Sequence, residues 1–148
     1  MNDATIAALS LEELSRGFLA ALPDAGRPPS EAETAFLSRV LEDYRPEELA
    51  RVTAADLGVV LASFWRFGAD HHAGAPNARL IRAQGVGGRD LGADLLEIVQ
   101  PDAPFLVDSV MGEVSEFGLD VRAMFHPLAG TLAERLSMIQ VWLAPVGE

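Results

Sequence analysis

One stretch of the sequence, residues 94–126, constrains the fold more than any other. An apolar segment at 94–100 stops at a proline, residues 103–117 carry apolar side chains at helical spacing, and residues 119–126 alternate apolar and polar. This alternation is typical of a strand with one buried face, and Gly118 can end the helix in a left-handed conformation. The stretch therefore predicts a strand, a helix and a second strand of one sheet.

Two further short segments, 78–84 and 137–143, have the composition of strands. We expect a glycine-rich hairpin connection at 85–93 and a loop at 128–136. Because strand–helix–strand connections within one sheet are right-handed, a hairpin strand can insert between the two strands that the helix joins. The predicted order across the sheet is 78–84, 94–100, 137–143, 119–126, with the helix 103–117 over one face.

The first half of the chain is predicted to be helical. Apolar residues recur at helical spacing over residues 4–22, as one helix or two short ones, and over 31–43 and 54–68. A serine followed three residues later by a glutamate, the pattern of a capping box, occurs at Ser10 and at Ser30.

These segments predict an α+β protein. We expect a helical N-terminal segment at 1–70 and a partial α/β module at 71–148, which together form one compact unit. A chain of 148 residues matches the usual size of one domain and needs no disulfide or metal for stability.

Composition excludes several classes of function. The formal net charge of −11 argues against nucleic-acid binding, which needs clustered lysine and arginine. Without cysteine, a disulfide framework, thiol catalysis and cysteine-type zinc sites are excluded. The sequence has neither a signal-peptide pattern nor an apolar run of roughly 20 residues, so we expect a cytoplasmic protein that does not bind membranes.

Three patterns resemble functional sites but lack the residues those sites require. Asp70-His71-His72 matches a phosphoesterase tripeptide, but carboxylates that could hold its two metals are missing, so we predict a solvated loop and no metal site. The glycines at 85–88 lead into a strand rather than a helix, unlike a dinucleotide-binding loop. Asp108 and His126 could form an acid–base pair, but nothing in the sequence positions them. We predict no catalytic residue.

The turn before the helix 103–117 is the candidate ligand site. It places free backbone N–H groups at a helix N-terminus beside a strand end, where a carboxylate can bind. The predicted ligand-binding residues are Asp102, Ala103 and Phe105. The alternative is that Asp102 only caps the helix.

The same region carries a family resemblance. Pro104-Phe105-Leu106-Val107-Asp108-Ser109, then Gly118-Leu119, then His126-Pro127 follow one another in this order. This pattern resembles the N-terminal, ACT-like region of the large bacterial NAD-specific glutamate dehydrogenases, and the resemblance extends over roughly residues 36–143. Two features differ from that family: two acidic residues and a methionine usually occupy positions 101–103, and the hairpin 128–136 is usually longer.

The resemblance implies a much longer polypeptide, in which a downstream core holds NAD and the catalytic lysine and aspartate. This chain would contain neither cofactor nor catalytic residue. ACT-like modules are ferredoxin-type folds that bind amino acids at strand–helix turns and subunit interfaces. They normally have a second helix and a fourth strand, for which the sequence to Glu148 leaves no room, so strand 78–84 is expected to occupy the vacant sheet edge.

Three hypotheses follow. The first is a non-catalytic regulatory or assembly domain of an NAD-dependent glutamate dehydrogenase. Its partners would be the remainder of the polypeptide, other subunits and possibly a small amino-acid effector. The second is a free-standing ACT-like amino-acid sensor or protein-interaction module, which a stop codon directly after Glu148 would favour. The third is a small hydrolase that uses Asp108 and His126, which a large separation of these side chains would exclude.

Overall fold

A computed structural model describes residues 9–69, 77–101, 105–130 and 135–146. The helices are α1 (Leu11–Ala20), α2 (Glu31–Asp43), α3 (Ala54–Ala69) and α4 (Leu106–Glu116), with a 3-10 turn η1 (Val86–Gly88). The strands are β1 (Asn77–Gln84), β2 (Asp90–Pro101), β3 (Val121–Phe125), β4 (Leu128–Gly130) and β5 (Arg135–Leu143). The class is α+β, as predicted.

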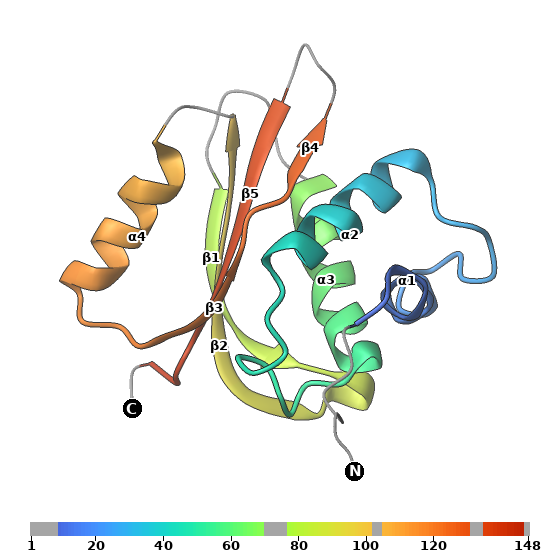
Figure 1. The fold of residues 1–148 in the computed structure, drawn as a ribbon, viewed down its shortest axis with the longest axis horizontal. Coiled ribbons are helices and arrows are strands. Elements are labelled where there is room, and N and C mark those ends of the chain that lie inside the picture. The colour runs from blue at the N-terminus through green and yellow to red at the C-terminus, as the bar shows by residue number, and fades with distance from the viewer. Residues whose placement is uncertain (1–8, 70–76, 102–104, 131–134, 147–148) are drawn as a thin grey trace.

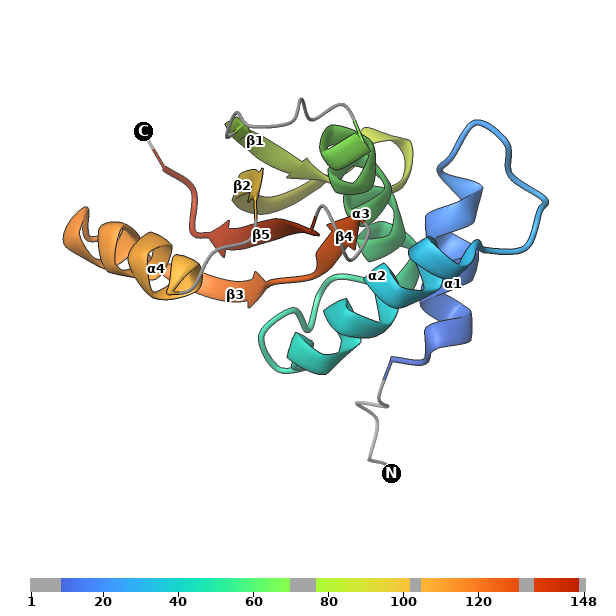
Figure 2. The same ribbon diagram turned by 90° about the horizontal axis from the view of Figure 1, so that it is seen from above.

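One antiparallel sheet separates two layers of helices (Figure 1). The strand order is β1-β2-β5-β3, which confirms the predicted order, and β4 pairs with β5. Helices α1, α2 and α3 lie on one face of the sheet, and α4 lies on the other. In Figure 2, α4 lies beside β3, at one side of the sheet.

The connection between β1 and β2 is shorter than predicted. Strand β2 begins at Asp90 rather than 94, so only residues 85–89 join the two strands. A bulge makes this possible: the register shifts between Arg82 and Gln84, and Gln84 pairs with Asp90. The Arg82 Nε also donates to Asp90 Oδ1 at 2.9 Å across the pair.

The predicted loop 128–136 is wrong in part. Residues 128–130 form β4, which pairs with the first residues of β5, and β5 begins at Arg135 rather than 137. The Met138 N–H donates to the Pro127 carbonyl at 3.0 Å, so pairing continues past the proline. Pro127 lacks an N–H but keeps a carbonyl, and it therefore interrupts the ladder without ending it.

The helical layer depends on two capping boxes and one close helix crossing. Ser10 caps α1 and Ser30 caps α2, each with the glutamate three residues later, as predicted. Helices α1 and α3 meet where both have glycine: a Cβ on Gly58 would lie 2.4 Å from the Gly17 carbonyl carbon. The two backbones are therefore in direct contact, which only a residue without a side chain allows.

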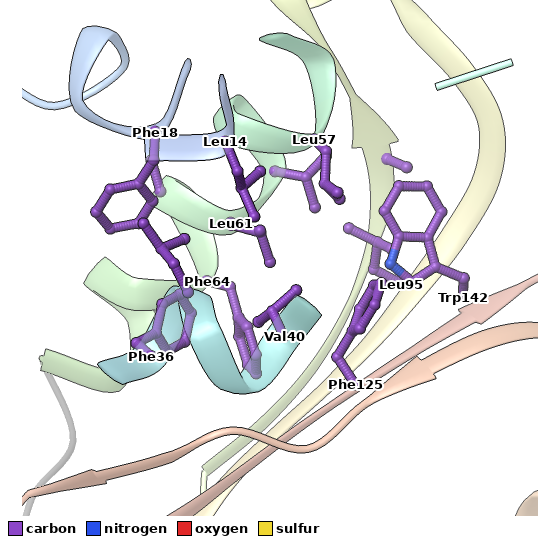
Figure 3. Packing of buried hydrophobic residues seen from close by; sticks show 14 of the residues in the cluster. Leu14, Phe18, Phe36, Val40, Leu57, Leu61, Phe64, Leu95, Phe125 and Trp142 are labelled. Carbon is purple, nitrogen blue, oxygen red and sulfur yellow. The ribbon is translucent and has the colours of Figure 1, made fainter. Parts of the chain in front are cut away.

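The larger hydrophobic core fills the space between these helices and the sheet (Figure 3). Its helical half contains an aromatic cluster in which the Phe36 and Trp65 ring centroids are 4.8 Å apart. Its sheet half comes from β2, β3 and β5, with Leu95, Phe125 and Trp142 pointing toward the helices. This core connects the helical segment with the sheet.

Strand β3 contributes to both faces of the sheet, whereas the sequence predicted one buried face. Ala123 and Phe125 belong to the core shared with α1–α3, but Val121 and Met124 belong to a second cluster under α4. The register between β3 and β5 shifts between Val121 and Ala123. This bulge reverses the alternation, because one extra residue moves all later side chains to the opposite face.

Helix α4 ends as predicted but begins later than predicted. Gly118 has φ +70°, and the N–H groups of Gly118 and Leu119 donate to the Ser115 and Val114 carbonyls at 3.0 and 3.2 Å. This is a Schellman motif, which requires the left-handed residue that glycine provides. The helix begins at Leu106, not 103.

Candidate functional site

The start of α4 differs from an ordinary capped helix. The residue at the N-cap position is Phe105, which has φ 62° and ψ 16°, and its side chain makes no capping hydrogen bond. The residue is 78% exposed. The other two predicted ligand-binding residues, Asp102 and Ala103, lie outside the described residues. A non-glycine residue in the left-handed region is uncommon and strained, and such residues cluster at ligand sites.

A shallow hollow of about 230 Å³ adjoins this turn. Phe105, Leu106, Val107 and Asp108 line it together with His126. The first N–H groups of a helix have no carbonyl one turn earlier to bind, so they point out of the helix start. Asp108 lies in this first turn. The hollow therefore offers backbone donors for a carboxylate and one carboxylate for a cation.

His126 brings the end of β3 to this hollow. Its backbone N–H donates to Asp43 Oδ2 at 3.0 Å, and its Nε2 lies 3.2 Å from Ser137 Oγ. The structure places Asp108 and His126 at the same hollow, so their separation does not exclude the acid–base hypothesis. However, Ser137 is fully buried, so the hydroxyl that contacts the imidazole is not accessible as a nucleophile.

A chain of hydrogen-bonded polar side chains, which no sequence pattern predicted, crosses the sheet. Arg79, Glu97 and Gln140 lie directly opposite one another on β1, β2 and β5. Arg79 Nε donates to Glu97 Oε1 at 2.7 Å, and Gln140 Nε2 donates to Glu97 Oε2 at 2.7 Å. Trp142 Nε1 donates to Gln140 Oε1 at 2.9 Å, and Arg79 Nη2 donates to the Ser63 hydroxyl of α3 at 3.0 Å.

This chain surrounds a carboxylate with no exposed surface. Burial raises the pKa of Glu97, while the hydrogen bond from Gln140 and the charge of Arg79 act in the opposite direction. The guanidinium of Arg79 also lies 4.2 Å from the Phe67 ring centroid. The sequence signal was a single polar residue in the middle of each of two apolar strands, DLLEIVQ and SMIQVWL. A buried polar group requires hydrogen-bond partners, and Glu97 and Gln140 are partners of each other.

The glycine-rich turn serves the fold rather than a phosphate. The buried Asp56 carboxylate of α3 accepts a hydrogen bond from the Val86 N–H at 3.0 Å and pairs with Arg89. Burial acts to raise the pKa of Asp56, but the Val86 N–H, the Thr53 hydroxyl and Arg89 together lower it. A Cβ on Gly85 would lie 2.3 Å from Asp56 Oδ1, so this turn needs glycine to approach α3.

The metal and membrane predictions concern partly undescribed segments. Residues 70–72, the tripeptide considered for a two-metal site, lie outside the described residues. Among residues 9–69, 77–101, 105–130 and 135–146, no group of three histidine, aspartate or glutamate side chains could hold a metal ion. Of the helices described, none has the length and apolarity to cross a bilayer.

The antiparallel sheet, the helix α4 over one face and the strand order define an ACT-like α+β domain. Comparison with family models gives the particular family: residues 36–134 match the ACT1 domain of glutamate dehydrogenase, which is more than half of the chain. The chain belongs to this family and is an N-terminal domain of a glutamate dehydrogenase, an oxidoreductase. The resemblance found in the sequence is thereby confirmed.

No curated protein and no solved structure matches the chain. The matched range contains the second part of α2, from residue 36 on, together with helices α3 and α4, strands β1–β4 and the hollow next to Phe105.

Proposed function

We propose that the chain is a non-catalytic regulatory or assembly domain of a cytoplasmic, NAD-dependent glutamate dehydrogenase. The match of residues 36–134 to the ACT1 domain carries this proposal. The whole enzyme would convert L-glutamate, water and NAD⁺ to 2-oxoglutarate, ammonium, NADH and a proton. Other segments of the polypeptide and other subunits would be the partners of this domain.

The arrangement of the glycine-rich turn supports a non-catalytic role. A dinucleotide site places a glycine-rich turn between a strand and the N-terminus of a helix, where the pyrophosphate binds. Here residues 85–89 join strand β1 to strand β2, and Asp56 fills the space beside Gly85. Two anionic phosphates would meet a buried carboxylate at this turn. The NAD of the parent enzyme would therefore bind elsewhere in the polypeptide.

We also propose that the turn 102–105 binds a small effector with a carboxylate and an ammonium group. Phe105 would provide an exposed ring and a left-handed turn, and Asp102 and Ala103 would provide the remaining contacts. The first backbone N–H groups of α4 would bind the carboxylate, and Asp108 would bind the ammonium group.

An activity assay tests the division of labour. The purified 148-residue chain, mixed with L-glutamate and NAD⁺, is expected to produce no NADH, whereas the full-length enzyme under the same conditions is expected to produce it. Replacing NAD⁺ by NADP⁺ in the full-length assay tests cofactor choice. Glutamate-dependent NADH formation by the 148-residue chain would overturn the proposal.

A calorimetric titration with amino acids tests the effector site. Phe105→Ala is expected to weaken binding, and Phe117→Ala provides the matched control, because Phe117 is 76% exposed at the other end of α4. Equal affinities of the two variants for the amino acid would show that the turn before α4 is not the effector site. Absence of heat for every amino acid would leave assembly as the role of the domain.

A further inference from the structure

A second hollow, larger than the one next to Phe105, lies on the opposite face of the sheet from α4. It has a volume of about 430 Å³, within the range of about 300–1,000 Å³ typical of small-molecule sites. The connection between α2 and α3, residues 47–52, forms one wall, and the beginning of β2 forms another. Trp142 and Ala93, both buried members of the larger core, also line it.

Four charged residues also line this hollow. Glu47, Glu48 and Arg51 come from the α2–α3 connection, and Arg122 comes from β3. In the part of the chain that the structure describes, none of the four belongs to an ion pair. Two positive and two negative charges therefore remain available around one hollow. The net charge of these four residues is zero, so the hollow favours neither a purely anionic nor a purely cationic ligand.

Two parts of this arrangement are fixed in position. Arg122 Nη1 donates to the Gly92 carbonyl at 2.8 Å, which orients the guanidinium and leaves its other N–H groups available. The buried Leu49 anchors the wall that carries the three other charges, and the Val52 N–H donates to the Leu49 carbonyl at 3.0 Å. The Arg122 guanidinium is therefore held in place before a ligand binds, which reduces the entropy lost on binding.

We propose that this hollow is a second ligand site, specific for a small α-amino acid bound as a zwitterion. Arg51 and Arg122 bind the α-carboxylate, and Glu47 and Glu48 bind the α-ammonium group. An aliphatic side chain packs over Leu49 and the edge of Trp142. The site goes beyond the proposed function, which places an effector at the turn before α4.

The contacts to the carboxylate and to the ammonium group of the ligand can be tested separately. Arg51 and Glu47 form no ion pair in the described residues, so Arg51→Gln and Glu47→Gln should leave the fold unchanged. Suitable probes are L-valine, N-acetyl-L-valine, which lacks the ammonium group, and L-valinamide, which lacks the carboxylate. Calorimetry measures binding, and circular dichroism confirms folding of each variant. Trp142 emission, measured in a Trp65→Phe background, locates the ligand.

L-Valine should bind saturably and change the Trp142 emission. Arg51→Gln should weaken L-valine binding about tenfold, because the carboxylate of L-valine loses its Arg51 partner. The same substitution should leave L-valinamide binding unaffected, because L-valinamide has no carboxylate. Glu47→Gln should weaken L-valine about tenfold and leave N-acetyl-L-valine unaffected. Arg16→Gln, an exposed position on α1, provides the control and should change nothing.

Three results would overturn this site. The first is the absence of both heat and emission change with L-valine. The second is an unchanged L-valine affinity in both Arg51→Gln and Glu47→Gln. The third is binding that is lost only in Phe105→Ala, which would assign the ligand to the turn before α4 and leave the proposed function standing.

Discussion

Glu97 and Gln140 face each other at the centre of the sheet, and the Gln140 amide donates to the Glu97 carboxylate at 2.7 Å. Both side chains are fully buried. Arg79 on β1 donates to the other carboxylate oxygen, so the Glu97 carboxylate on β2 is bound from both neighbouring strands. A buried carboxylate with fewer partners would be strongly destabilising, so these three residues fix which strands can be neighbours and in what register.

Glu97→Ala should be among the most destabilising substitutions in the sheet. It leaves the Gln140 amide and the Arg79 guanidinium without their acceptor and creates a cavity at the sheet centre. We expect a loss of about 3 kcal/mol in the free energy of unfolding, measured by urea denaturation. Glu97→Gln keeps the shape and an acceptor oxygen, and should cost less. An equal loss for both variants would show that the charge on Glu97 is decisive and the space it fills is not.

The ion pair between Arg27 and Glu33 predicts a specific pH dependence. Arg27 binds both oxygens of the Glu33 carboxylate at 2.7 Å, and this lowers the pKa of Glu33 from 4.5 to about 2, against the effect of burial. An acid with a lowered folded-state pKa stabilises the fold above its unfolded pKa and loses this contribution as the pH falls through the folded value.

Glu33→Gln tests this dependence, because glutamine keeps the capping box of α2 but not the charge. Wild type should exceed the variant in free energy of unfolding above a pH of about 4.5. The difference should shrink between a pH of about 4.5 and about 2, as measured by urea denaturation at several pH values. A difference that does not change with pH would contradict the assignment.

Two glycine substitutions should have opposite effects, because only one of the two glycines lies in the close contact between α1 and α3. Gly58→Ala places a methyl group 2.4 Å from the Gly17 backbone and 2.5 Å from the Phe18 nitrogen, so α1 must move. We expect a loss of about 2 kcal/mol or more, by thermal or chemical denaturation. Gly112→Ala is the matched control: it lies within α4, where an added Cβ meets no atom within 4 Å. It should stabilise the protein by about 0.5–1 kcal/mol.

Asp56 predicts a local effect at the β1–β2 turn. Asp56→Ala removes the acceptor of the Val86 N–H and the partner of Arg89. We expect a loss of about 2 kcal/mol and faster hydrogen exchange of the Val86 amide, measured by NMR. Asp108→Ala, an exposed position in the first turn of α4, is the comparison and should cost less than about 1 kcal/mol. An unchanged Val86 exchange rate in Asp56→Ala would show that Asp56 does not hold this turn.

Local signals determined the elements of this protein. The serine and glutamate of each capping box fixed the beginnings of α1 and α2, and Gly118 fixed the end of α4, because each acts within four residues of its own position. The apolar strands and their antiparallel order also followed from the sequence, since connection rules allow few alternatives. For the candidate ligand site, the sequence predicted the helix but placed its start at 103 instead of Leu106, and it did not reveal the left-handed Phe105 or the nearby His126.

Only the tertiary structure decided which side chains meet. Glu97 and Gln140 are 43 residues apart, and Asp56 and Val86 are 30 apart, so no local pattern pairs them. The bulge at 121–123 reversed the faces of β3 because β3 must pair with β5 while both sheet faces are covered. Local propensity sets the conformation of a segment, whereas register, bulges and buried polar pairs depend on a partner strand that only the folded chain supplies.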